Sequence, residues 1–193
     1  MNEYHVFGSI ISTAAQIIGK QITVGSFTVI EDHALLDSGH SNKSMISIGC
    51  RCKIKQGVVL RTYGGEIRIG NRVSIGEYSV LAGHSSLIIG DCTIIAAHCY
   101  ISAANHIFSN DEIIRFQGET SRGINIGKDC WIGGNTMILD GVDIGDGCVV
   151  GAGSVVTTSL PPNTICRGAP CQKVRTREPF PKWEVTRNEI RIG

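Results

Sequence analysis

Two histidines, His84 and His106, are candidates for acid–base chemistry in this sequence. An imidazole can accept or donate a proton near neutral pH, and it also ligates metals. His106 follows Ser-Ala-Ala-Asn and opens a long stretch, residues 107–125, that ends where an aliphatic pattern resumes. A surface histidine is often structural or idle, so its role depends on the elements that position it.

Those elements form a six-residue repeat, in which every sixth residue is Ile, Val or Leu. The repeat falls into six groups of three: positions 18, 24, 30; 48, 54, 60; 69, 75, 81; 89, 95, 101; 126, 132, 138; and 144, 150, 156. A six-residue period with regular turns is typical of a parallel β-helix, whose coils stack about 4.8 Å apart. The sequence therefore predicts an all-β solenoid of about six or seven triangular coils.

The corners of each coil differ in how much they can vary. Glycine follows the first aliphatic of every group and the second aliphatic in four of the six, which predicts two tight corners. Steps within a group are always six residues, so every insertion leaves after the third aliphatic. Leu81 and Ile101 are third aliphatics, which places His84 and His106 toward this insertion edge, one coil apart. Loops on a rigid scaffold often carry function, so this edge is the expected site of chemistry.

A second pattern comes just before each third aliphatic, at positions that strand alternation turns outward. All six residues there are apolar: Val29, Val59, Val80, Tyr100, Met137 and Val155. Such a stripe would run about 25 Å along the solenoid. A soluble monomer seldom exposes an apolar patch of this kind, so we expect another subunit to cover it. The chain's own C-terminal tail is the alternative cover.

Composition and charge narrow the functional classes. A length of 193 residues suits one domain, and a net charge of +1 without blocks of like charge does not favour nucleic acid or an anionic membrane as partner. No stretch approaches the roughly 20 apolar residues of a membrane helix, and the N-terminus does not resemble a signal peptide. We therefore expect a cytoplasmic protein without an integral membrane segment.

Within the single domain, 1–193, three segments depart from the regular coils. Residues 1–17 read as a partial N-terminal coil and residues 107–125 as a protruding loop. Residues 157–193 abandon the repeat and contain all five prolines. Proline-rich irregular chain blunts an open sheet edge, so this tail is expected to cap the last coil.

The eight cysteines do not indicate a disulfide framework or a metal site, because no Cys-x-x-Cys pair occurs. Side-chain alternation makes the residue two positions before each aliphatic point inward as well. Four cysteines occupy that position: Cys52, Cys99, Cys130 and Cys148. Other coils have Thr, Ser or Val there, so these cysteines read as small core residues.

Residues 126–157, from Ile-Gly-Lys-Asp-Cys-Trp-Ile-Gly to Gly-Ser-Val-Val-Thr, resemble the C-terminal coils of hexapeptide-repeat acyltransferases. Pro-Pro-Asn-Thr and Gly-Ala-Pro continue the likeness, which covers roughly residues 46–175. The segments Gly-His-Ser-Ser-Leu-Ile-Ile-Gly and Ser-Ala-Ala-Asn-His resemble the branch that O-acetylates bacterial capsule and O-antigen sugars. The resemblance implies a left-handed β-helix, whereas the general rule for crossovers favours the right hand.

The resemblance also implies an activity, namely transfer of acetyl from acetyl-CoA to a sugar hydroxyl of a surface polysaccharide or its precursor. It implies a homotrimer with active sites between subunits. His106 matches the family's general base, which would remove the hydroxyl proton during attack on the thioester. His84 would hold the acceptor or orient the base, and Asn105 would supply a hydrogen bond. No metal is expected.

Family correspondence also suggests where acetyl-CoA would bind. The residues matching the groove for its pantetheine arm are Trp131, Gly134, Gly151, Ala152 and Thr157. Small residues suit such a groove because a linear arm must approach the backbone closely. After Gly-Ala-Pro this chain has Cys171 and Gln172 before the basic Lys173, where many relatives have one small residue, so the phosphate contacts stay open. Further candidates for them are Arg167, Arg175 and Arg177.

Three other readings remain open from the sequence. N-acetylation of an amino sugar on the same scaffold is the nearest. A zinc site like that of γ-type carbonic anhydrases would need His84, His98 and His106, but His98 follows a second aliphatic and belongs to a different edge. A purely structural β-helix would leave the long loop and the Trp131 motif unexplained.

Overall fold

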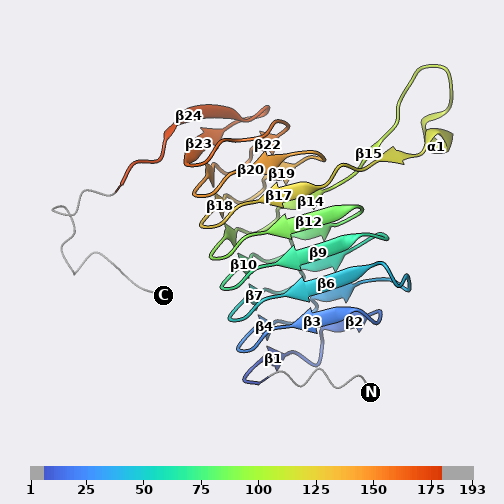
Figure 1. Ribbon diagram of the computed structural model, residues 1–193, viewed down its shortest axis with the longest axis vertical. Helices are drawn as coiled ribbons and strands as arrows, with labels where there is room; N and C mark the ends of the chain where they lie inside the picture. The colour runs from blue at the N-terminus through green and yellow to red at the C-terminus, as the bar shows by residue number, and fades with distance from the viewer. Residues whose placement is uncertain (1–6, 180–193) are drawn as a thin grey trace.

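The computed structural model describes residues 7–179, which form a left-handed parallel β-helix with three sides (Figure 1). Each coil adds one short strand to each side, so the predicted all-β solenoid is confirmed. The only helix in this range is the four-residue α1 (Ile114–Gln117). No helix there is long and apolar enough to cross a membrane. Residues 1–6 and 180–193, which belong to the predicted partial coil and capping tail, lie outside the described range.

The three sides are named after the aliphatic that each carries. The first side has strands β3 (Ile22–Val24), β6 (Met45–Ile48), β9 (Glu66–Ile69), β12 (Ser86–Ile89), β17 (Ile124–Ile126) and β20 (Asp143–Ile144). The second has β1 (Ile10–Ile11), β4 (Val29–Ile30), β7 (Lys53–Ile54), β10 (Ser74–Ile75), β13 (Ile94–Ile95), β18 (Trp131–Ile132), β21 (Val149–Val150), β23 (Thr164–Arg167) and β24 (Gln172–Thr176). The third has β2 (Gln16–Ile18), β5 (Leu35–Asp37), β8 (Val59–Arg61), β11 (Val80–Ala82), β14 (Tyr100–Ser102), β19 (Met137–Ile138) and β22 (Val155–Val156).

The repeat's aliphatics fill the interior of the prism. Ile54, Leu60 and Ile75, for example, are completely buried, and they stack on equivalent residues of the adjacent coils. The residues two positions earlier are buried too, which confirms the predicted inward position of Cys52, Cys99, Cys130 and Cys148. Their thiols contact carbonyl oxygens of the next coil, as Cys99 Sγ does with Gly133 O at 3.3 Å. The aliphatic core thus holds the coils together.

The predicted grouping of the first coil is wrong by one hexad. Val24, Ile30 and Leu36 pair with the first, second and third aliphatics of the following coil, whereas Ile18 lies at the end of the incomplete β2. The glycine rule could not reveal this, because Gly19 and Gly25 follow Ile18 and Val24 alike. The first insertion therefore begins after Leu36.

This shift also corrects the apolar stripe. Val29 lies on the second side, in register with Lys53, and is not part of the stripe. Leu35 takes its place on the third side, in register with Val59. We define the third-side stripe as Leu35, Val59, Val80, Tyr100, Met137 and Val155, which are in register from coil to coil. All six are partly or fully exposed in the single chain.

The longest insertion leaves the prism as a hairpin that projects far from the coils (Figure 1). Its base is a two-stranded antiparallel ladder of β15 (Asn105–His106) and β16 (Glu119–Thr120), and α1 lies near its tip. The predicted insertion edge therefore carries the hairpin, between the third side of one coil and the first side of the next.

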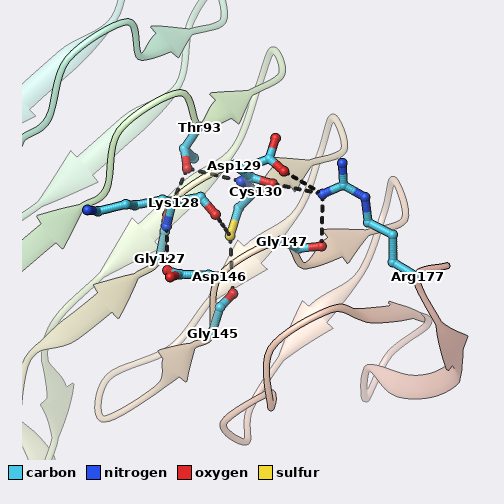
Figure 2. Close-up of polar contacts among 9 residues, drawn as sticks. All are labelled: Thr93, Gly127, Lys128, Asp129, Cys130, Gly145, Asp146, Gly147 and Arg177. Carbon is cyan, nitrogen blue, oxygen red and sulfur yellow. Dashed lines mark hydrogen bonds and ion pairs between the residues drawn. The ribbon is translucent and has the colours of Figure 1, made fainter. Parts of the chain in front are cut away.

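The C-terminal segment follows the repeat further than predicted. Leu160 bridges to Ile144 on the first side, and Cys166 pairs with Val150 on the second, so the chain adds a further partial coil after Val156. Strand β24 then pairs antiparallel with β23. Beyond it, Arg177 donates from Nη1 to the Asp129 carboxylate at 2.8 Å and to the Gly147 carbonyl at 3.3 Å (Figure 2). These bonds tie the tail to the corner between the first and second sides.

Candidate active site

The structure brings His84 and His106 together at the insertion edge, around one carboxylate. His106 lies directly opposite Glu119 in the ladder at the base of the hairpin. Its Nδ1 is 3.7 Å from Glu119 Oε1, and Nδ1 of His84 is 3.6 Å from Glu119 Oε2. Both contacts are within ion-pair range and longer than a hydrogen bond. Glu119 therefore stands between the two imidazoles.

The position of His84 depends on an unusually close backbone approach. Its φ is 43°, and a Cβ added to Gly65 in the preceding coil would lie 1.5 Å from the His84 carbonyl oxygen. Only glycine fits at residue 65. The His84 ring stacks on Tyr63, with 4.7 Å between centroids and 12° between planes. Tyr63 of the preceding coil thus supports the imidazole of His84, and Glu119 of the hairpin lies near its Nδ1 atom.

The base of the hairpin is fixed to the coils by two polar side chains. Ser121 Oγ donates to the Ala103 carbonyl and accepts the Ser85 N–H at 3.0 Å. Asp140 Oδ1 accepts the N–H groups of Arg122 and Gly123 at 2.8 and 2.9 Å, where the chain rejoins the first side. Ser121 and Asp140 therefore fix the chain at the base of the ladder that carries His106 and Glu119.

A cavity of about 140 Å³ lies between the histidines and the third side, and Tyr100, Ser102 and Asn105 contribute to its lining. The two imidazoles differ in access, since the His106 side chain is 67% exposed and that of His84 only 19%. With Nδ1 turned to Glu119, the Nε2 atom of His106 is left for a substrate. The arrangement fits a general base at the mouth of a small polar site, with His84 behind it.

Sequence reasoning did not identify Glu119. It lies outside the hexad repeat, in a loop with several acidic residues, and only the antiparallel ladder selects it. The sequence offers one indication of Glu119. It lies near the end of an insertion that begins with His106, and a hairpin brings its two ends together. Ser121 was missed for the same reason, and Tyr63 was missed because its contact with His84 arises from the stacking of two coils.

Three of the residues expected to bind the donor meet at the corner between the second and third sides. The Gly134 carbonyl accepts the Gly153 N–H at 2.8 Å, which sets Ala152 beside it in the next coil. Gly151 shares this corner, and an added Cβ there would lie 3.0 Å from Arg167 Cβ. Ala96 and Ala97 continue the row of small residues in the preceding coil. We call this corner between the second and third sides, with its row of glycines and alanines, the small corner. A linear group could approach the backbone along it.

The other expected donor residues lie elsewhere. Trp131 points outward on the second side, 55% exposed, and lines a cavity of about 780 Å³ with Arg175 and Arg177. Lys173 is exposed on β24, in register with Cys166. Thr157 follows the third-side strand β22 and so belongs to the edge that also carries the histidines. Arg177 is hydrogen-bonded to Asp129 and Gly147. It is therefore a weaker candidate than Arg167 or Arg175 for binding a phosphate of coenzyme A.

The small corner and the histidines lie at opposite edges of the third side. The chain runs from Ala97 at the first edge through strand β14 to Ala103 at the second, a span of up to about 20 Å for six extended residues. A donor along the small corner is therefore not beside the His106 of the same chain. The two parts meet only if the donor crosses the face or a second chain supplies one of them.

His98 does not join the other two histidines. It lies at the corner between the second and third sides and stacks on Tyr78, with 5.6 Å between ring centroids. Across residues 7–179, no group of three or more His, Cys, Asp or Glu side chains is placed to hold a metal ion. Within a single chain, the three histidines required for the zinc alternative do not converge.

Comparison with known sequences matches residues 123–158 to the family described as bacterial transferase hexapeptide, six repeats. Galactoside O-acetyltransferase of Escherichia coli strain K12 is 50% identical over 52 residues, which cover 27% of this chain and 26% of that protein. The chain therefore matches only about a quarter of the length of such curated relatives. The family match covers the regular coils around Trp131.

Solved structures extend the likeness over most of the chain. A variant of AntD, an N-acyltransferase from Bacillus cereus in complex with dTDP and coenzyme A, superposes with a TM-score of 0.67 and 25% identity, covering 89% of this chain and 85% of that one. The polySia-specific acetyltransferase NeuO has a similar fold, with a TM-score of 0.65, 22% identity and coverage of 96% and 84%. Residues 123–158 therefore carry the bacterial transferase hexapeptide repeat, and the chain around them has the left-handed β-helix fold of these acyltransferase structures.

Proposed function

We propose that this protein is an acetyl-CoA-dependent O-acetyltransferase that acts on a sugar hydroxyl of a surface polysaccharide or its precursor. The observation that carries the proposal is the placement of His106 opposite Glu119, with Nδ1 facing the carboxylate and Nε2 free. An alcohol is a poor nucleophile at neutral pH and needs a base. The hexapeptide family and the acyltransferase structures with this fold support the acyl-transfer chemistry.

The reaction would proceed by direct transfer. The acceptor hydroxyl gives its proton to His106 Nε2 as its oxygen attacks the thioester carbonyl carbon. The tetrahedral intermediate then collapses, breaking the carbon–sulfur bond, and the departing thiolate of coenzyme A takes the proton from the imidazolium. The products are the acetyl ester and free coenzyme A, and no acetyl-enzyme forms.

Glu119 would act as the positioning residue for His106. A carboxylate on the Nδ1 side holds the proton on that nitrogen, so that Nε2 carries the lone pair, and it stabilises the imidazolium during the transfer. The contact of 3.7 Å would shorten to a hydrogen bond in the complex with substrates, as catalytic contacts often do. His84 would keep the carboxylate in place through its other oxygen.

The donor would lie along the small corner at Gly134, Gly151 and Ala152, with Trp131 on the adjoining side. Because this corner is separated from His106 by the width of the third side, we propose that the active form is a homotrimer. The third-side stripe would be covered by a neighbouring subunit, whose small corner would come close to His106. The exposed apolar side chains of the stripe, such as Tyr100 at 42% and Met137 at 43%, support this arrangement.

N-acetylation of an amino sugar is the second candidate. It is favoured by the likeness to AntD, which is an N-acyltransferase and was solved with a sugar nucleotide in related complexes. An amine needs less help from a base once it is deprotonated. Treatment of the acetylated product with mild alkali separates the two, because esters are cleaved and amides are not.

The test is acetyl transfer from acetyl-CoA to a panel of neutral and acidic saccharides, amino sugars and nucleotide sugars, followed by mass spectrometry. We expect His106→Ala to lower the rate by about 10²–10⁴-fold while the unfolding temperature stays near that of the wild type. His33→Ala, an exposed histidine at another corner, is the control and should keep full activity. A His106→Ala variant with near wild-type turnover would defeat the assignment.

A further inference from the structure

The insertion edge carries a charged and aromatic column that continues away from His106 toward the N-terminal coils. Arg61 and Tyr63 follow the third aliphatic of one coil, and His84 follows that of the next. The Arg61 guanidinium lies 5.7 Å from the centre of the Tyr63 ring, and the same ring stacks on His84. The column thus connects Arg61 to the wall of the His106 cavity.

The orientation of Arg61 is fixed at one end of its guanidinium group. Its Nε donates to Asp37 Oδ2 at 3.0 Å, in a pair whose carboxylate side chain is only 18% exposed. The Tyr63 side chain interacts with the guanidinium and raises the pKa of Arg61. Among the described residues no carboxylate pairs with its two terminal nitrogens, and the side chain is 38% exposed. A guanidinium held through Nε and by an aromatic face presents its remaining N–H donors as a fork, which suits a carboxylate or a phosphate.

The distance between Arg61 and the cavity defines the size of the ligand. Arg61, Ala82 and Ser102 are in register on successive strands of the third side, and Ser102 lines the cavity beside His106. Two rungs correspond to about 10 Å. A neutral monosaccharide with its hydroxyl at His106 would not reach Arg61, whereas a second sugar residue or a phosphate-linked group would.

Left-handed backbone alone does not mark this column as functional. Tyr63 and His84 both have positive φ, but so do non-glycine residues at the other corners, such as Tyr78 and His98. What distinguishes the column is its place at the insertion edge, where it meets the cavity, together with the fixed cation at its far end.

We propose that Arg61, oriented by Asp37 and Tyr63, binds an anionic group of the acceptor about two rungs from the hydroxyl that His106 activates. This inference rests on the proposed function and adds the substrate class, an anionic sugar derivative larger than one neutral monosaccharide. The anionic group is either a carboxylate of an acidic oligosaccharide or the diphosphate of a nucleotide sugar. Both offer the oxygen pair that a guanidinium fork binds.

The test separates binding from turnover. Calorimetry with the full chain measures affinity for a hexuronic-acid oligosaccharide, for the same oligosaccharide with its carboxyl groups reduced to alcohols, and for a nucleoside diphosphate sugar. We expect the wild type to bind one anionic ligand at least about tenfold more tightly than the reduced oligosaccharide, and Arg61→Gln to remove that preference. Arg68→Gln, which breaks a comparable exposed pair with Glu66 on the first side, should leave it unchanged.

Turnover provides the second readout. Arg61→Gln should raise KM for the anionic acceptor about tenfold and leave kcat and the KM for acetyl-CoA within twofold, and Arg61→Lys should restore part of the loss. Equal affinity of the wild type for charged and reduced oligosaccharides, or equal behaviour of Arg61→Gln and Arg68→Gln, overturns the subsite. Charge-dependent binding through Arg61 without any acetyl transfer would instead contradict the proposed function and leave the subsite standing.

Discussion

His106 and Glu119 face each other across a two-residue antiparallel ladder, although thirteen positions separate them in the chain. The ladder aligns an imidazole Nδ1 with a carboxylate oxygen at 3.7 Å, and the proposed reaction would use the other ring nitrogen, Nε2. His84 reaches the other oxygen of the same carboxylate from the preceding coil. The hairpin therefore contributes Glu119 to the candidate site, in addition to projecting from the coils.

The first prediction concerns Glu119. Glu119→Gln should lower kcat at least about tenfold, because the amide neither stabilises the imidazolium nor fixes the tautomer of His106. The loss should stay well below the roughly 10⁴-fold effect of a buried, tightly bonded carboxylate, since the Glu119 side chain is 44% exposed. Steady-state kinetics of acetyl transfer measures it. Glu112→Gln in the same hairpin is the matched control, and equal rates for both variants would contradict the positioning role.

The second prediction concerns the close approach of Gly65 to His84. Gly65→Ala should destabilise the fold by roughly 1–3 kcal/mol and displace His84, because the new methyl group would meet the His84 carbonyl. Gly64→Ala is the neighbouring control, where an added Cβ meets no atom within 4 Å and only the positive φ of 101° opposes the change. Urea unfolding of both variants gives the comparison. A larger loss for Gly64→Ala would contradict the predicted contact.

The third prediction concerns thiol reactivity. Cys50 and Cys92 are exposed, and the other six cysteines are buried. Burial raises the pKa of the Cys52, Cys99, Cys130 and Cys148 thiols, and burial next to Cys171 raises that of Cys166 strongly. Because the thiolate is the reactive form, a thiol reagent at pH 8 should modify two groups quickly and the rest only after denaturation. More than two fast groups in the native protein would be inconsistent with this core.

The same pKa shifts predict how stability depends on pH. A thiol whose pKa is raised by folding stays protonated in the native state while the unfolded chain loses its proton above about pH 8.5. The unfolded state then binds fewer protons, so the free energy of unfolding should fall as the pH rises from 8 to 10. Denaturant titrations across this range measure the slope. Replacing Cys99 with Ser should reduce that slope, and an unchanged slope would argue against the buried thiols as its cause.

The fifth prediction concerns the third-side stripe. Val80→Glu should dissociate the proposed trimer, because a charge would be buried in the interface without a partner. Val29→Glu is the matched control, since Val29 has similar partial exposure but lies on the second side. Sedimentation equilibrium gives the masses. A wild-type protein that is monomeric at all concentrations would contradict the trimer, and dissociation by Val29→Glu alone would contradict the assignment of the interface to the third side.

Much of the fold could be read from the sequence because its signal is periodic and local. An inward aliphatic every sixth residue and glycine at two corners predict the solenoid, the buried cysteines and the insertion edge with His84 and His106. The first coil shows the limit of such a signal. Ile18, Val24, Ile30 and Leu36 are all in phase, and only strand pairing shows that the last three form the coil.

The sequence by itself determined the solenoid and the edge that carries His84 and His106. The inward aliphatics repeat in every coil, so an insertion or an error in one coil does not hide the pattern. The tertiary structure decided which residues meet at that edge. Glu119 faces His106 because a hairpin brings its ends together, and Arg61, Tyr63 and His84 form a column because their coils are stacked. Contacts of this kind depend on register and loop geometry, which no local pattern encodes.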